Sequence, residues 1–181
     1  MIMHNNPKTD IKSNPEKNNI ILTGMPGAGK STLGVVLAKI LGYDFLDSDL
    51  LIQSQEKRRL PDIIDSEGIE GFIRIENEVN AAIRTNHTVI ATGGSVVYGK
   101  EAMEHLKSIG TIVYLKIPYD ELILRLGSLK NRGVVLYPGE SLEDLYARRT
   151  PLYEYYADIT IEESGKSLEE SLAAVIEALN I

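Results

Sequence analysis

Short apolar runs alternate with longer amphipathic segments from residue 20 to the end of the chain. Short runs rich in β-branched residues predict buried strands, and apolar positions spaced three or four residues apart predict helices. The runs place five strands at 20–22, 43–47, 88–92, 111–115 and 159–161. The amphipathic segments place helices at 30–41, 50–67, 69–85, 100–108, 119–126, 141–156 and 167–180, and Pro61 should interrupt the second of them.

The predicted helices carry start and stop signals. Gly42 follows the first helix, and Ser141-x-x-Asp144 and Ser167-x-x-Glu170 are capping-box patterns at the starts of the last two. Strands that alternate with helices predict a parallel sheet covered on both faces, with ligands bound at the carboxyl ends of the strands. We therefore expect an α/β fold, a three-layer sandwich around a five-stranded parallel sheet.

The composition limits the classes of protein to consider. A chain of 181 residues that is 43% hydrophobic and 25% charged predicts one globular domain, 19–181, after a polar and disordered tail, 1–18. A formal charge of −7 argues against nucleic-acid and anionic-membrane partners, and no apolar run approaches the ~20 residues of a membrane span. The absence of cysteine excludes disulfides and thiolate zinc sites. We expect a cytoplasmic monomer that binds small molecules.

Residues 24–32 read Gly-Met-Pro-Gly-Ala-Gly-Lys-Ser-Thr, a complete phosphate loop between a predicted strand and a predicted helix. Its glycines let the backbone turn and bring N–H groups against phosphate oxygens, and the helix N-terminus adds partial positive charge. Lys30 should bridge the β and γ phosphates of ATP, and the Ser31 hydroxyl should ligate Mg²⁺. The loop residues expected to bind nucleotide are Gly24, Gly27, Ala28, Gly29, Lys30, Ser31 and Thr32.

Two more polar segments follow predicted strands. Asp47 and Asp49 come where the second strand ends, so their carboxylates should face the phosphate loop across the strand tips. One could hold Mg²⁺, and the other could accept the proton of an attacking hydroxyl. Gly93, Gly94 and Ser95 follow the third strand, where glycine allows the backbone to approach a ligand closely.

Several cations lie in or near a long loop at 127–140, whose length and flanking glycines predict a lid. Arg125 precedes this loop, and Lys130 and Arg132 lie within it, where they could cover a triphosphate and neutralise charge that develops during transfer. Arg149 stands two residues before Pro151, which should bend its helix and aim the neighbouring side chains.

Taken together, these motifs resemble the shikimate kinase family of phosphate-loop, nucleoside-monophosphate-kinase-like enzymes. The resemblance extends from residue 20 to the last helix. The motifs that carry it are the phosphate loop with Gly34, Asp47-Ser48-Asp49, Gly68-x-x-x-Phe72-x-x-x-Glu76, Thr92-Gly93-Gly94, Val113-Tyr114-Leu115, the spacing of Arg125 to Arg132, and Arg149-x-Pro151-Leu152-Tyr153 followed by Ala157-Asp158.

The resemblance implies roles for five residues. By resemblance, Asp47 helps to hold Mg²⁺, and Asp49 binds the ring hydroxyls of the substrate. Arg125 is implied to stack on adenine, and Arg132 to contact phosphates and substrate from the lid. Arg149 is implied to grip the substrate carboxylate.

The chain departs from the family pattern in its acceptor pocket. Ile73 replaces the family's second carboxylate-binding arginine, and Arg74 stands one residue later, about 100° further around the helix. Ser95 replaces a glycine, and Gly133 replaces the proline that usually follows the lid arginine. The residues expected to bind the acceptor are Asp49, Arg74, Gly93, Gly94, Ser95 and Arg149.

The resulting hypothesis is a kinase that uses ATP and Mg²⁺ to phosphorylate a small, carboxylate-bearing metabolite, with shikimate as the first choice. Lys30, Asp49 and Arg132 are its expected catalytic residues. One alternative is a kinase of another small acceptor, such as gluconate, a hydroxy amino acid or a nucleoside monophosphate. A second alternative is a non-catalytic nucleotide sensor, although a sensor would need no carboxylate to activate an acceptor.

Overall fold

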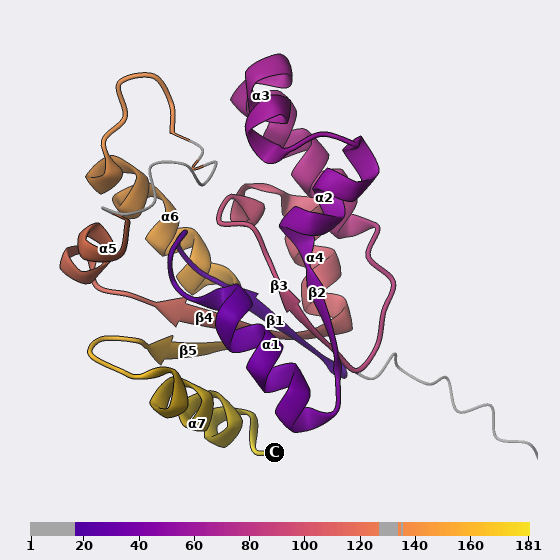
Figure 1. Cartoon of the computed structure of the whole chain (residues 1–181), viewed down its shortest axis with the longest axis vertical. Helices are drawn as coiled ribbons and strands as arrows, with labels where there is room; N and C mark the ends of the chain where they lie inside the picture. Colours follow the sequence, from indigo (N-terminus) through magenta and orange to yellow (C-terminus); the bar gives the residue numbers. More distant parts are fainter. Residues whose placement is uncertain (1–16, 127–133, 135) are drawn as a thin grey trace, which may run out of the picture.

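Five parallel strands form the centre of the molecule (Figure 1). The computed structural model describes residues 17–126, 134 and 136–181. The strand order is β2-β3-β1-β4-β5, and every described pairing is parallel. The strands are β1 (Asn19–Thr23), β2 (Asp44–Asp47), β3 (Thr88–Ala91), β4 (Gly110–Lys116) and β5 (Ile159–Glu162). The predicted five-stranded parallel sheet is confirmed.

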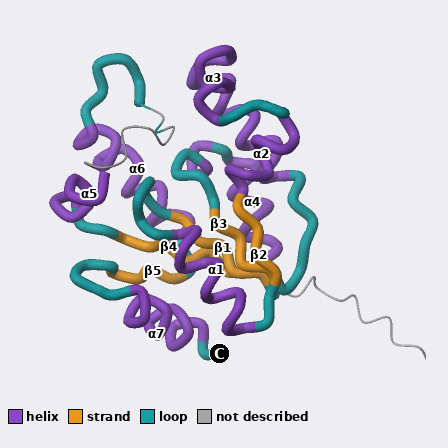
Figure 2. The backbone as a smooth tube through the Cα atoms, in the orientation of Figure 1, coloured by secondary structure: helices purple, strands orange, loops and turns teal. Residues whose placement is uncertain are grey.

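Helices cover both faces of this sheet, as the tube view in Figure 2 shows. In one layer α1 packs with α7, whereas α4 and α6 lie in the opposite layer and pack against β4 (Figure 1). The helices are α1 (Lys30–Leu41), α2 (Ser48–Glu56), α3 (Leu60–Ala81), α4 (Lys100–Ile109), α5 (Tyr119–Leu126), α6 (Leu142–Tyr156) and α7 (Leu168–Leu179), and η1 (Val96–Tyr98) is a short 3-10 turn. The three-layer sandwich is therefore confirmed, and none of the described helices is long and apolar enough to cross a bilayer.

The position of each strand in the sheet explains its sequence. β1 lies in the middle, and its residues Ile20, Ile21 and Leu22 are no more than 4% exposed. Because both faces of a central parallel strand are covered, its sequence is a continuous apolar run without alternation. β2 lies at the edge, and its four residues remain exposed or half-buried.

The helix ends differ from the prediction around Pro61. α2 begins at Ser48 and ends at Glu56, where Lys57 takes a left-handed conformation with φ 56°. Pro61 then stands in the first turn of α3, where a missing backbone N–H costs no helical hydrogen bond. The break between α2 and α3 thus precedes the proline. A further interruption lies within α3 at Gly68, which has φ 72° and ψ 178°.

Capping boxes start the last two helices, as their sequence patterns predict. Ser141 Oγ accepts a 3.1 Å hydrogen bond from Asp144 N, and Ser167 Oγ accepts one of 3.2 Å from Glu170 N. In each case the acidic side chain accepts a hydrogen bond from the backbone of the serine. Both patterns therefore satisfy donors that a helix start leaves free.

Candidate active site

The loop between β1 and α1 is shaped by its glycines. Gly24, Gly27 and Gly29 have φ of 145°, 83° and 85°, a region that side-chain-bearing residues rarely adopt. Gly29 is the N-cap of α1 and supplies no side chain to cap it, and the first turn of α1 holds no acidic residue. The first N–H groups of α1 are therefore not taken up by a side-chain cap, which suits them to an anionic phosphate.

Lys30 folds back onto this loop. Its Nζ donates hydrogen bonds of 2.8 Å to the Gly24 carbonyl and 2.9 Å to the Met25 carbonyl. Burial lowers the pKa of the Lys30 ammonium to about 8, and the charge of Asp49 opposes that shift. The loop thus holds a buried cationic group whose hydrogen bonds a phosphate oxygen could replace.

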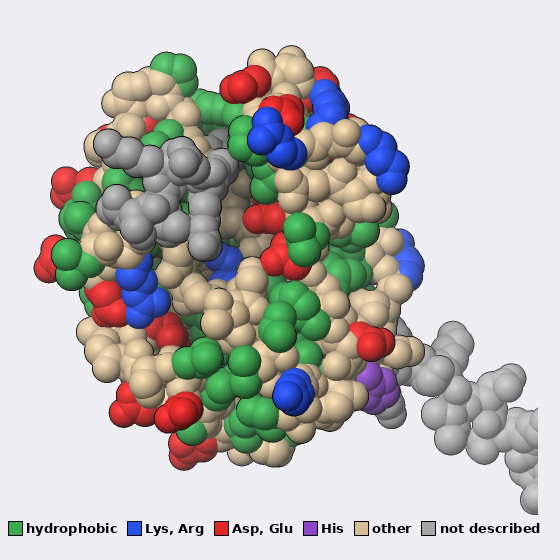
Figure 3. All heavy atoms as spheres, in the orientation of Figure 1, with side chains coloured by type: hydrophobic (Ala, Val, Ile, Leu, Met, Phe, Trp, Pro, Cys, Tyr) green, Lys and Arg blue, Asp and Glu red, His purple; other side chains and the backbone are tan. Residues whose placement is uncertain are grey.

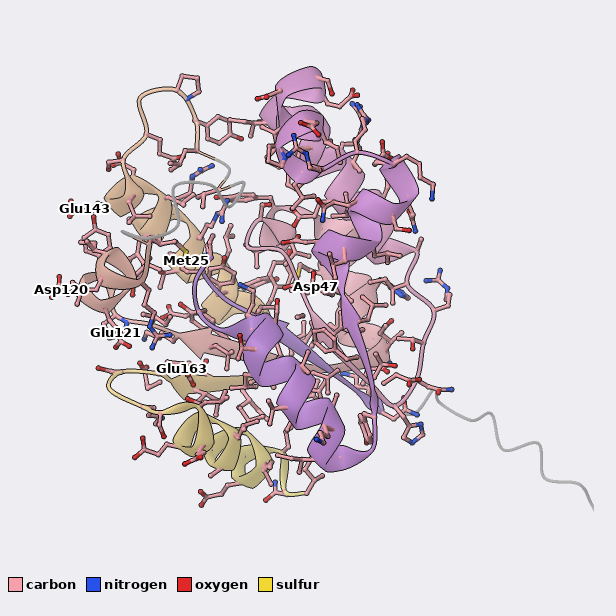
Figure 4. The ribbon with its side chains drawn as sticks, in the orientation of Figure 1. Met25, Asp47, Asp120, Glu121, Glu143 and Glu163 are labelled. Carbon is pink, nitrogen blue, oxygen red and sulfur yellow. The ribbon has the colours of Figure 1, made fainter. Side chains whose placement is uncertain are left out.

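Ser31 and Asp47 bring the start of α1 and the end of β2 together. The Ser31 hydroxyl donates a 2.7 Å hydrogen bond to Asp47 Oδ2. Asp47 Oδ1 accepts from the backbone N of Asp49 at 3.0 Å and of Leu50 at 3.2 Å, so Asp47 also caps α2. Figure 4 shows Asp47 and Met25 at the same end of the sheet.

This pair of side chains suits Mg²⁺. Mg²⁺ in phosphate sites is held by one or two carboxylates together with substrate phosphates and water, and hard oxygen ligands are what it prefers. The Ser31 hydroxyl and the Asp47 carboxylate supply such oxygens side by side. No cluster of three or more His, Cys, Asp or Glu side chains with metal-binding geometry occurs within 17–126, 134 and 136–181. The two oxygen ligands from Ser31 and Asp47 thus fit Mg²⁺, whose remaining ligands in such sites are phosphate oxygens and water.

Asp49 and Glu76 converge on Gly93. A Cβ atom built on Gly93 would lie 2.2 Å from Glu76 Oε1 and 2.7 Å from Asp49 Oδ1. Only glycine fits between these carboxyls without displacing them. The N–H of Gly93 donates a 3.2 Å hydrogen bond to the buried Ser48 hydroxyl, which fixes this turn against α2.

Burial shifts the pKa of both carboxyls upward. For Asp49 burial is the main cause, the neighbouring charge of Asp47 adds to it, and Lys30 opposes it. For Glu76 burial raises the pKa to about 8; Asp49 adds to the shift, while Ser95, Arg149 and Lys30 oppose it. Glu76 is 1% exposed, and neither of its oxygens has a hydrogen-bond partner of good geometry among the described residues.

Arg149 lies on the other side of this turn. Arg149 is 1% exposed; its guanidinium donates a 3.1 Å hydrogen bond from Nε to the Tyr98 hydroxyl and lies 5.3 Å from the centroid of the Tyr98 ring. A Cβ atom on Gly94 would come within 2.9 Å of both Arg149 Nη1 and Pro26 Cδ. The Tyr153 hydroxyl donates to the Gly94 carbonyl at 2.5 Å. Gly94 is therefore packed between the phosphate loop and α6.

Most of the residues singled out from the sequence thus lie around one point at the carboxyl end of the sheet. The space-filling view in Figure 3 shows the molecule hollowed in this region, with acidic and basic side chains together at its wall. The residues brought together are Lys30, Ser31, Asp47, Asp49, Gly93, Gly94, Ser95 and Arg149.

Of the four cations predicted to join the site, Arg74 and Arg125 lie on described helices, and Lys130 and Arg132 lie outside the described residues. Arg74 is exposed, and Glu76, two residues later on α3, points inward. Arg125, in the last turn of α5, pairs with Glu121. Arg132 lies outside the described residues, as does most of the predicted lid, 127–140. Their roles in binding stay predictions.

Other side chains at the site have no role assigned from the sequence. Ser48, Tyr98 and Tyr153 form hydrogen bonds to Gly93, Arg149 and Gly94 respectively. These bonds join segments that lie far apart in the sequence, so no local pattern indicates them. Glu76 belongs to a recognisable motif, Gly68-x-x-x-Phe72-x-x-x-Glu76, but its lack of a partner appears only in the folded chain.

Known proteins match this chain over nearly its whole length. The family model described as shikimate kinase matches residues 26–180. Shikimate kinase of Histophilus somni is 38% identical over 92% of this chain and 99% of its own, and that of Shewanella sediminis is 39% identical over 91% and 98%.

Solved structures of shikimate kinases are also similar to this chain. Shikimate kinase from Acinetobacter baumannii in complex with shikimate has a TM-score of 0.81 at 34% identity and covers 93% of this chain and 96% of its own. Shikimate kinase from Aquifex aeolicus has a TM-score of 0.77 at 31% identity, with 90% and 96% coverage. With the phosphate loop, the paired aspartates and the buried arginine in place, the chain belongs to the shikimate kinase family.

Proposed function

We propose that this protein transfers the γ-phosphate of ATP to the 3-hydroxyl of shikimate and releases ADP and shikimate 3-phosphate. The observation that carries the proposal is that Asp49 and Arg149 meet at the turn at 93–94, where both act on Lys30 of the adjoining phosphate loop through their charge. The Acinetobacter baumannii relative, which is similar over 93% of this chain, is in complex with shikimate.

On the nucleotide side, the backbone N–H groups of 24–32 hold the phosphates. Lys30 exchanges the carbonyls of Gly24 and Met25 for phosphate oxygens, and its charge stabilises the negative charge that develops during transfer. We also propose that Arg125 stacks on adenine and that Arg132 closes over the transferring group, as the family resemblance implies.

Oxygen ligands of this chain would hold the metal. Ser31 Oγ and Asp47 Oδ2 would hold Mg²⁺ beside the loop. When bound, the ion neutralises charge on the phosphate oxygens. Asp47 remains in place because its other oxygen is fixed by the N-terminus of α2.

On the acceptor side, Asp49 orients the reacting hydroxyl and accepts its proton. Its raised pKa, caused first by burial, makes the carboxylate a better base than an exposed aspartate. Arg149 binds the carboxylate of shikimate, and its contact with Tyr98 holds the guanidinium in position before the acceptor arrives.

A coupled assay of ADP release with shikimate at millimolar concentration tests the proposal, and ³¹P NMR of the product identifies the phosphorylated hydroxyl. We expect turnover that depends on Mg²⁺ and yields shikimate 3-phosphate. Turnover of gluconate, a hydroxy amino acid or a nucleoside monophosphate in place of shikimate would keep the reaction class and reject the acceptor. Tight ATP binding without transfer to any acceptor would instead favour a nucleotide sensor.

We further propose that the enzyme works as a cytoplasmic monomer on small molecules, without nucleic-acid or membrane partners. The net charge of −7 supports the absence of nucleic-acid and membrane partners because it disfavours binding to anionic surfaces. Size-exclusion chromatography with light scattering measures the mass in solution, and a dimer mass would overturn the proposal of a monomer.

A further inference from the structure

The acceptor pocket contains a buried carboxyl group that the proposed transfer chemistry does not use. Glu76 lies on α3 and is 1% exposed. Neither Oε1 nor Oε2 has a hydrogen-bond partner of good geometry within the described parts of the chain. Buried polar groups in proteins are nearly always paired, so an unpaired carboxyl beside a binding site calls for an explanation in terms of what binds there.

The sequence of α3 explains why the carboxyl lacks a partner. Ile73 lies three residues before Glu76, on the same side of the helix, and offers only apolar atoms. Arg74 is about 200° around the helix from Glu76 and is exposed, as is Glu78. The helix that carries Glu76 therefore supplies no cation to it.

Other elements supply the charges that face Glu76. They are Asp49 on α2, Lys30 on α1 and Arg149 on α6, and the Ser95 hydroxyl after β3 also acts on it. Lys30 Nζ already donates to Gly24 and Met25, and Arg149 Nε donates to Tyr98. Lys30 and Arg149 act on Glu76 through their charge, and the Ser95 hydroxyl lies close enough to lower its pKa although the contact falls short of hydrogen-bond geometry.

Glu76 also lies against the turn at 93–94, next to the groups proposed to act on the acceptor. Its Oε1 is 2.2 Å from the position of a Cβ on Gly93, the same point that Asp49 Oδ1 approaches to 2.7 Å. Arg149 Nη1 approaches the corresponding point on Gly94 to 2.9 Å. The Glu76 carboxyl is thus buried beside the turn at 93–94, near both the group proposed to orient the hydroxyl and the group proposed to bind the acid.

A carboxyl in this setting favours its neutral form. An ionised carboxylate that is buried without a hydrogen bond is very costly, and such groups take up a proton instead. The pKa of about 8, raised mainly by burial, is consistent with this. A neutral carboxyl differs from a carboxylate in one important way, because its O–H can donate a hydrogen bond.

We propose that Glu76 is a specificity-determining residue that stays protonated in the pocket and donates a hydrogen bond to the carboxylate of the acceptor, beside Arg149. Glu76 thereby makes the second contact to the acceptor carboxylate, which in the family pattern comes from an arginine at the position of Ile73. The inference rests on the proposed function, since it requires an acceptor that carries an acid group. An ionised Glu76 would act in the opposite sense: it would repel a carboxylate and favour an amine.

Steady-state kinetics with shikimate between pH 6 and 9 tests the inference in the wild type, Glu76→Gln and Glu76→Ala. The amide of glutamine donates a hydrogen bond at every pH, so we expect KM for shikimate to match the wild type near pH 6.5 and to remain flat toward pH 9. The wild-type KM should rise about tenfold over the same range as Glu76 loses its proton, and Glu76→Ala should raise KM about tenfold already at pH 6.5. The matched control is Glu78→Gln, an exposed position on the same helix, which should follow the wild type.

Two further measurements separate this role from a structural one. The kcat and the KM for ATP should stay within about twofold of the wild type in Glu76→Gln. A lower KM for shikimate in Glu76→Gln would overturn the inference, because it would reveal an ionised, repelling carboxylate. An unchanged KM in a folded Glu76→Ala would overturn it too.

Carboxyl ¹³C NMR of the free protein keeps the inference distinct from the proposed function. We expect one glutamate signal that titrates near pH 8, as the value of about 8 for Glu76 requires, and that is lost in Glu76→Gln. A Glu76 signal that titrates near 4.5, the ordinary value, would refute a neutral carboxyl whatever the acceptor. If the protein does not turn over shikimate but the Glu76 signal titrates near pH 8, the proposed acceptor is refuted and the neutral carboxyl is supported.

Discussion

The Ser31 hydroxyl donates a 2.7 Å hydrogen bond to Asp47 Oδ2, which connects the first turn of α1 to the end of β2. Asp47 uses its other oxygen to cap α2 through the N–H groups of Asp49 and Leu50. The Asp47 carboxylate therefore has one observed task, which is to cap α2, and one proposed task, which is to hold Mg²⁺ through its charge.

The substitution Asp47→Asn separates these tasks. Asparagine caps helices about as well as aspartate, so thermal stability should change little, whereas loss of the charge should weaken Mg²⁺ binding. We expect the Mg²⁺ concentration for half-maximal activity to rise by roughly tenfold or more, measured by Mg²⁺ titration at saturating ATP. Asp44→Asn, an exposed site at the start of the same strand, is the control. An unchanged Mg²⁺ requirement would leave Asp47 with the capping role alone.

Replacement of Lys30 by methionine tests the phosphate loop. Methionine keeps most of the apolar stem but removes the ammonium that donates to Gly24 and Met25, so ATP affinity and kcat should both fall. From the typical contribution of one preorganised electrostatic group, we expect a loss of about 10²–10³ in kcat. Isothermal titration calorimetry measures the ATP affinity. Lys39→Met, exposed in the last turn of α1, should leave it unchanged. Equal ATP affinity in Lys30→Met and wild type would remove the basis of the catalytic proposal.

The Tyr98 hydroxyl should matter for the acceptor and not for ATP. The substitution Tyr98→Phe keeps the ring beneath the Arg149 guanidinium but removes the oxygen that accepts from Arg149 Nε. Loss of one hydrogen bond from a charged donor costs about 1–3 kcal/mol, so we expect KM for shikimate to rise roughly tenfold while the KM for ATP stays unchanged. Tyr155→Phe, at a position 76% exposed on α6, is the control. A fall in thermal stability with no change in KM would mean that Tyr98 only supports the fold.

Glu76 should also make stability depend on pH. Its pKa in the folded state, about 8, is above the ordinary value of 4.5, so between these values the folded chain holds a proton that the unfolded chain releases. The folded state then binds more protons, and the free energy of unfolding falls as pH rises through this window. Relative to Glu76→Gln, the wild type should lose stability, on the order of a few kcal/mol at most, between pH 5 and 8.

Urea denaturation of both proteins across this range measures the difference. The pKa of Lys30, lowered to about 8, makes stability rise with pH only above that value, so the comparison is cleanest below pH 8. A constant difference between wild type and Glu76→Gln from pH 5 to 8 would show that Glu76 has an ordinary pKa in the folded protein.

Much of the fold could be predicted from the sequence, because it depends on local patterns. The apolar run at 20–22 predicts a central strand, and β1 is buried on both faces. The capping boxes at Ser141 and Ser167 form as their spacing predicts. The break near Pro61 was placed too late, since a proline within the first turn of a helix is as compatible with the pattern as one that ends a helix.

The candidate site was less completely predictable. Asp47, Asp49, Gly93 and Gly94 follow strands, and parallel strands bring their carboxyl ends to one edge, so their proximity follows from chain order. The role of Tyr98 could not be foreseen because this residue ends a 3-10 turn and meets Arg149 only across the fold. Arg74 was expected to bind the acceptor, yet its position on α3 leaves it exposed in the structure.

By itself the sequence determined the order of strands and helices and the chemistry of the phosphate loop, because hydrophobic period, glycine content and the Lys30-Ser31 pair act over a few neighbouring residues. Only the tertiary structure decided which charges meet. Whether Glu76 has a partner, and whether Arg149 is held by Tyr98, depends on contacts between distant segments. Burial then sets the protonation of those groups, because the cost of a charge depends on how completely the folded chain removes it from water.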